Sequence, residues 1–138
     1  MLISTEMKLY YDIVSGKYDK NTQYKGDDVR RVITRFAPEN VEKNQPLLDL
    51  LHEVANKKGI TPAQISLAWM LKKYDFVVPI PGMRKDERVI ENLGAAGIEL
   101  TDAEFEKIEK ELDKITIYGN RTDEDIHKLG TVKAIETK

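Results

Sequence analysis

A short apolar run, FVVPI at Phe76 to Ile80, most constrains what this chain can fold into. The run is β-branched and continuous rather than alternating, which is typical of a strand buried on both faces of a parallel sheet. Pro79 weakens this prediction because it has no N–H to donate to a strand ladder. A lone strand leaves backbone N–H and C=O groups unpaired at a cost in free energy, so we expect other strands to cover it.

Most of the remaining chain has helical patterns. Thr61 with Gln64, and Thr101 with Glu104, have the spacing of a capping box, in which the two residues satisfy each other's backbone N–H groups. Pro46 is expected to kink or split the long pattern that contains it. The ranges predicted to be helical are 4–14, 29–36, 38–58, 61–74, 86–95, 101–115 and a short tail helix at 122–128.

Composition excludes several classes of protein. The 138 residues suffice for one domain and include no cysteine, so no disulfide framework or thiolate metal site is available and cytoplasmic location is the default expectation. No stretch approaches the ~20 apolar residues of a membrane span. The formal net charge of −2 argues against nucleic acid, and a helix-turn-helix built on TPAQISLAWML is too apolar to face a groove.

The end of the predicted strand is a candidate anion site. The chain passes from the strand through Pro81 and Gly82 directly into a helix, which brings unpaired N–H groups and the positive end of the helix dipole to one place. Cationic and amide side chains follow within two turns: Arg84, Lys85, Arg88, Glu91 and Asn92.

A structural interpretation of the same residues stays open. Asp86 can cap the helix, and Arg88 and Glu91 can form a solvated ion pair contributing roughly 0.2–0.5 kcal/mol. Arg84 and Lys85 then simply face water. The pattern alone favours this interpretation, because charged strand-to-helix turns are common.

The stretch VVPIPGMRKDERVIENLGAAGIELTDAEFEKIE resembles the C-terminal segment of aldo-keto reductases, in which the last barrel strand ends in Ile-Pro-Gly and the next helix ends in Glu-Asn-Leu-Gly-Ala. The resemblance extends over residues 16–138, whereas residues 1–15 fit it poorly. It implies an α/β fold, a C-terminal fragment of a (β/α)8 TIM-type barrel that is mostly helical within this chain, with about one short parallel-type strand.

The resemblance also implies a cofactor, NADPH, whose adenosine 2′-phosphate end is held at this junction. By position, Gly82, Arg84 and Lys85 lie along the phosphate, Arg88 pairs with it, and Glu91 and Asn92 address the adenine. Met83 replaces the threonine or serine that relatives usually carry, and so removes a hydroxyl donor to the phosphate.

The family's catalytic Asp, Tyr, Lys and His belong to an earlier part of the barrel, so no catalytic residue is assigned here. The six tyrosines show no pairing that suits proton donation, and His52 and His127 are too far apart in sequence to suggest a metal site. We therefore expect a truncated reductase that meets a small carbonyl substrate only in an assembled barrel, and that self-associates or docks on a complementary fragment. The alternative is a catalytically dead helical interaction module that does not bind a nucleotide.

Overall fold

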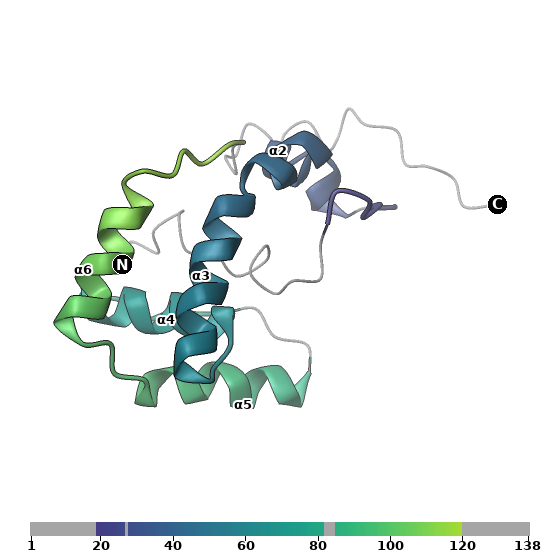
Figure 1. Ribbon diagram of the computed structural model, residues 1–138. Helices are drawn as coiled ribbons and strands as arrows, with labels where there is room; N and C mark the ends of the chain where they lie inside the picture. The colour runs from purple at the N-terminus through teal and green to yellow at the C-terminus, as the bar shows by residue number, and fades with distance from the viewer. Residues whose placement is uncertain (1–18, 27, 82–84, 120–138) are drawn as a thin grey trace. The chain divides into compact units, whose positions relative to one another are not determined.

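The computed structural model describes residues 19–26, 28–81 and 85–119. These divide into two compact units, one formed by the described residues of 46–115 and the other by those of 16–45 and 116–119. All regular elements of the described residues are helical (Figure 1). The helices expected at 4–14 and 122–128 lie outside the described residues.

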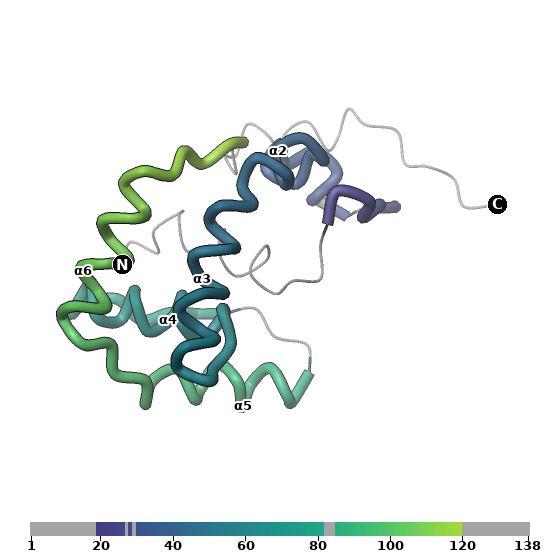
Figure 2. The backbone as a smooth tube through the Cα atoms, in the orientation of Figure 1, coloured from purple at the N-terminus to yellow at the C-terminus, as the bar shows by residue number. Residues whose placement is uncertain are grey.

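Four α-helices form the first unit, in which α3 (Gln45–Lys58) contributes its residues from Pro46 onward. The other helices of this unit are α4 (Pro62–Lys73), α5 (Asp86–Gly94) and α6 (Asp102–Leu112), and the 3-10 turn η3 (Ala95–Gly97) lies between α5 and α6. Figure 2 follows the backbone from α5 through η3 into α6. The buried apolar side chains come mainly from α3 and α4: Leu47, Leu48, Leu50, Leu51, Val54, Ala55, Ala63, Ile65, Leu67, Ala68, Trp69 and Met70.

Both predicted capping boxes are confirmed. The Thr61 hydroxyl accepts from the backbone N–H of Gln64 at 3.2 Å, and the Gln64 side chain accepts from the Thr61 N–H at 3.1 Å. The same reciprocal pair joins Thr101 and Glu104. In each case the sequence spacing satisfies N–H groups that the first helical turn leaves without intrahelical partners.

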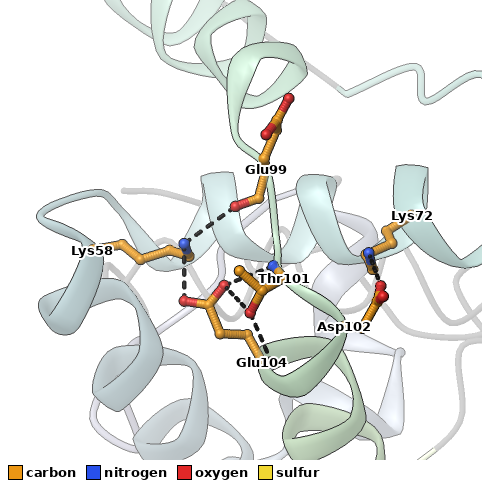
Figure 3. A network of polar contacts seen from close by, with 6 residues as sticks. All are labelled: Lys58, Lys72, Glu99, Thr101, Asp102 and Glu104. Carbon is orange, nitrogen blue, oxygen red and sulfur yellow. Dashed lines mark hydrogen bonds and ion pairs between the residues drawn. The ribbon is translucent and has the colours of Figure 1, made fainter.

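A polar network surrounds the N-terminus of α6 (Figure 3). Lys58 Nζ lies 2.9 Å from Glu104 Oε1 and donates to the backbone carbonyl of Glu99 at 3.2 Å. Lys72 pairs with Asp102 at 2.7 Å. The Lys58 ammonium, followed by the Thr101 backbone N–H, lowers the pKa of Glu104. Lysines from the ends of α3 and α4 thus hold the acidic first turn of α6.

The second unit contains the short helix α2 (Pro38–Lys43), preceded by the 3-10 turns η1 (Val29–Arg31) and η2 (Thr34–Phe36). The helix expected at 29–36 is therefore replaced by two 3-10 turns, because consecutive β-branched residues at 32–34 disfavour continuous α-helix. The expected break near Pro46 is confirmed, since Asn44 ends α2 and α3 begins at Gln45.

The predicted strand at Phe76 to Ile80 is not formed within the part of the chain that the structure describes. Residues 75–76 form a turn closed by the Val77 N–H donating to the Tyr74 carbonyl at 3.3 Å, and 77–81 has no regular secondary structure. A strand is defined by a pairing neighbour, and the described residues supply none. Three side chains of the run face solvent instead: Phe76, Val78 and Ile80, which are 74%, 68% and 60% exposed.

Among the described residues, no helix has both the length and the apolar character needed to cross a membrane.

Candidate functional site

The candidate anion site begins at the residues between the apolar run and α5. Gly82, Met83 and Arg84 lie outside the described residues. The structure therefore places the second half of the predicted site, from Lys85 to Asn92 on α5, and this half can be built from its contacts.

Lys85 is the N-cap residue of α5. Its backbone is extended (φ −135°, ψ 141°), and its carbonyl accepts from the N–H groups of Arg88 at 3.0 Å and Val89 at 3.3 Å. The Lys85 side chain makes no capping hydrogen bond, and Asp86 is the first helical residue rather than the cap. The exposed Lys85 ammonium and the uncapped N-terminus favour an anion, whereas the carboxylates of Asp86 and Glu87 compete with it.

Arg88 and Glu91 form an ion pair one helical turn apart. Their side chains are 28% and 16% exposed, so the pair is more shielded from water than most surface pairs. This is the pair that the structural interpretation of the sequence predicted. A phosphate bound at Arg88 has to share the guanidinium with Glu91.

Asn92 is buried on the inner side of α5, with 8% of its surface exposed. The structure therefore brings Arg88 and Glu91 together at a partly open position and turns Asn92 toward the protein interior. An adenine edge is more accessible to Glu91 than to Asn92 in this arrangement.

Gln64 fixes the position of α5, a role that sequence reasoning missed. Its amide nitrogen donates to the backbone carbonyl of Glu91 at 2.9 Å while its amide oxygen completes the capping box with Thr61. A Cβ at Gly94 would lie 2.9 Å from the same amide nitrogen, so a larger residue there requires the end of the Gln64 side chain to shift. The signal in the sequence was the capping box, whose glutamine has donors left after capping.

Aromatic and acidic residues elsewhere in the first unit have structural roles. The Trp69 indole N–H donates to Glu109 at 2.6 Å, and Lys73 pairs with the other carboxylate oxygen at 2.8 Å. His52 is exposed on α3. The described residues include no group of three potential ligands arranged for a metal ion.

Comparison with known proteins identifies the family of this chain. The aldo/keto reductase family model matches residues 9–113, which is most of the chain. The chain belongs to the aldo/keto reductase family. No solved structure gives a significant match.

Two relatives show how much of such a protein this chain spans. It is 34% identical over 108 residues to the "Aldo-keto reductase yakc [NADP(+)]" of Schizosaccharomyces pombe, covering 78% of this chain and 32% of the relative. It is 32% identical over 109 residues to the "Aldo-keto reductase str7" of Strobilurus tenacellus, covering 79% of this chain and again 32% of the relative. The chain therefore spans about a third of the length of these relatives.

Proposed function

We propose that this chain carries the adenosine 2′-phosphate half of the NADPH site of an aldo-keto reductase. The observation that carries the proposal is a family match running through an uncapped helix start with Lys85 as N-cap and Arg88 one turn later. The yeast relative bears NADP(+) in its name, which supports this cofactor.

The proposed division of roles follows the chain. Gly82, Met83, Arg84 and Lys85 run along the phosphate, and Arg88 pairs with it. Glu91 and Asn92 address the adenine, and the burial of Asn92 makes Glu91 the principal contact. In a complete (β/α)8 barrel the cofactor would serve reduction of an aldehyde or ketone to the alcohol, with the proton-donating residues supplied by the remainder of the barrel.

Two further parts of the proposal concern the state of the chain. We propose a cytoplasmic, truncated reductase unit comprising residues 16–138, without catalytic residues of its own. The exposed apolar run calls for a covering partner, either a second copy or a complementary barrel fragment.

Calorimetric titration of the chain with NADPH, NADH and 2′,5′-ADP tests the nucleotide site. We expect binding of NADPH and 2′,5′-ADP, weaker binding of NADH, and loss of the phosphate preference in Arg88→Ala. Lys114→Ala, which removes an exposed lysine outside α5, is the matched control and should leave binding unchanged. Absence of heat with all three nucleotides would instead favour the helical interaction module.

A further inference from the structure

Few apolar side chains of α5 are buried. Of its nine residues, all within the described part of the chain, only Asn92 is buried. Ile90 and Leu93, its two largest apolar side chains, are 72% and 70% exposed. The Lys85 side chain adds no capping hydrogen bond at the helix start. Because apolar burial is the main source of packing free energy, α5 depends more than α3 or α4 on individual polar contacts.

The last turn of α5 receives a donor from α4. In a continuing α-helix the Glu91 carbonyl would accept from the Ala95 N–H. Here the Ala95 N–H donates to the carbonyls of Asn92 and Leu93, and the chain goes on into the 3-10 turn η3. The Gln64 amide nitrogen donates to the Glu91 carbonyl at 2.9 Å. Gln64 therefore satisfies a carbonyl that the end of the helix leaves without an intrahelical partner.

The Gln64 side chain is itself held on a rigid element. Its amide oxygen accepts from the Thr61 N–H at 3.1 Å, and the backbone N–H of Gln64 donates to the Thr61 hydroxyl at 3.2 Å. The neighbours Ala63 and Ile65 are 3% and 0% exposed, which places this turn of α4 in the core. With both ends of its amide engaged, Gln64 has little rotational freedom, so the position of α4 determines that of α5.

The carbonyl that Gln64 holds lies in the turn that carries the proposed nucleotide contacts. The same residue, Glu91, supplies the carboxylate that pairs with Arg88 one turn earlier. The backbone of α5 also comes close to α4 there, since a Cβ at Gly94 would lie 2.9 Å from the Gln64 amide nitrogen. A shift of the Glu91 carbonyl moves both charged side chains together, and a displacement of about 1 Å is enough to weaken a preorganised site.

We propose that Gln64 is a positioning residue for nucleotide binding: its amide N–H anchors α5 so that Arg88 and Glu91 are presented together to the adenosine 2′-phosphate end of NADPH. This inference rests on the proposed function and adds to it a residue on a different helix. Gln64 acts through the backbone of α5 and not by contact with the nucleotide.

Two substitutions separate the anchor from the cap. Gln64→Met has a similar length and removes the donor to Glu91 together with the acceptor for the Thr61 N–H. Thr61→Ala removes the hydroxyl of the cap but keeps the backbone N–H, so the Gln64 amide stays oriented and still reaches Glu91. Both variants lose one capping hydrogen bond, which makes Thr61→Ala the matched control.

Three measurements on the full chain test the proposal: calorimetric titration with 2′,5′-ADP, amide hydrogen exchange of residues 89–94 without ligand, and circular dichroism. We expect the dissociation constant of 2′,5′-ADP to rise about tenfold in Gln64→Met and to stay within about twofold of the native value in Thr61→Ala, since only the former loses the bond to α5. Amide exchange in residues 89–94 should be faster in Gln64→Met alone, at equal helix content in all three proteins. A purely structural role of Gln64 would instead affect the two variants alike.

Gln64→Glu tests the same bond with the capping box intact, because a carboxylate accepts from the Thr61 N–H but cannot donate to the Glu91 carbonyl. This variant should also weaken 2′,5′-ADP binding and speed exchange in α5. Ala96→Glu adds the same charge at an exposed position after α5 and is the control for electrostatic repulsion. It should weaken binding less and leave exchange in α5 unchanged.

The possible failures are distinguishable. If the native chain binds no 2′,5′-ADP, the proposed function fails and this inference fails with it. If the native chain binds and Gln64→Met and Gln64→Glu bind equally well, this inference alone is overturned. Weaker binding without faster exchange in α5, or equal weakening by Thr61→Ala, would overturn it too.

Discussion

The side chain of Asn44 pairs with both backbone groups of Tyr118, a residue 74 positions later in the sequence. Its amide nitrogen donates to the Tyr118 carbonyl at 3.0 Å, and its amide oxygen accepts from the Tyr118 N–H at 2.9 Å. Asn44 is 1% exposed. One buried side chain thus satisfies both backbone groups of Tyr118, as a neighbouring strand would, and holds the segment after α6 to the end of α2.

Replacement of Asn44 by alanine should lower the free energy of unfolding by about 2 kcal/mol, because it removes two hydrogen bonds and leaves the Tyr118 groups unpaired. Urea unfolding followed by circular dichroism measures the change. Asn56→Ala, an exposed asparagine on α3, is the control and should stay within about 0.5 kcal/mol of the native chain. Equal losses in the two variants would show that the Asn44 contact contributes nothing.

Gly119 should be far less tolerant of alanine than Gly26, although both have positive φ, at +84° and +60°. A Cβ at Gly119 would lie 2.5 Å from the Arg35 Cα, a backbone atom that cannot swing away, whereas a Cβ at Gly26 meets nothing within 4 Å. We expect Gly26→Ala to cost about 1 kcal/mol for the left-handed backbone alone. Gly119→Ala should cost about 3 kcal/mol or more in the same urea assay.

The free energy of unfolding should fall at low pH as the Glu53 carboxylate is protonated. Hydrogen bonds from Lys107 at 2.8 Å and Lys57 at 2.6 Å lower the pKa of this carboxyl from 4.5 to about 2. Because the folded-state pKa is the lower one, the stabilisation is fully present above pH 4.5 and is lost as the pH falls toward 2. The urea midpoint of Glu53→Gln should lie below that of the native chain at neutral pH and converge with it in acid.

The control for this titration is Glu106→Gln, which removes an exposed carboxylate from α6. The difference in urea midpoint between Glu106→Gln and the native chain should stay nearly constant over the same pH range. Added salt should also narrow the gap between Glu53→Gln and the native chain, since both lysine contacts are exposed to solvent. A gap that persists at pH 2 would assign the effect to packing rather than to charge.

The N-cap of α6 can be tested with two substitutions of Thr101, one of which keeps the hydroxyl. Thr101→Ala removes the hydroxyl that accepts from the Glu104 N–H at 3.3 Å and should cost about 1 kcal/mol. Thr101→Ser keeps that acceptor and should cost less than half as much. If serine and alanine destabilise the chain equally, the methyl group rather than the cap holds this helix start.

The features that could be predicted from the sequence alone are those that depend on local interactions. The capping boxes at Thr61 and Thr101 and the helix break near Pro46 depend on residues a few positions apart, so their outcome is set before any packing occurs. The family resemblance was likewise readable from the stretch through Pro81, Arg88 and Glu91, and the family match confirms it. The ion pair between Arg88 and Glu91 was predictable as well, because an i,i+3 ion pair needs only the helix that carries it.

Contacts between distant residues were decided only by tertiary structure. Nothing near Asn44 in the sequence indicates that Tyr118 completes its hydrogen bonds. The capping box at Gln64 indicates that its amide has donors left, but not that they reach the Glu91 carbonyl on α5. The strand predicted at FVVPI also depends on contacts with distant residues, and it does not form because the described residues do not provide them. β-Branched composition favours an extended backbone, but a strand exists only where a neighbouring segment accepts its hydrogen bonds, and local sequence does not supply that neighbour.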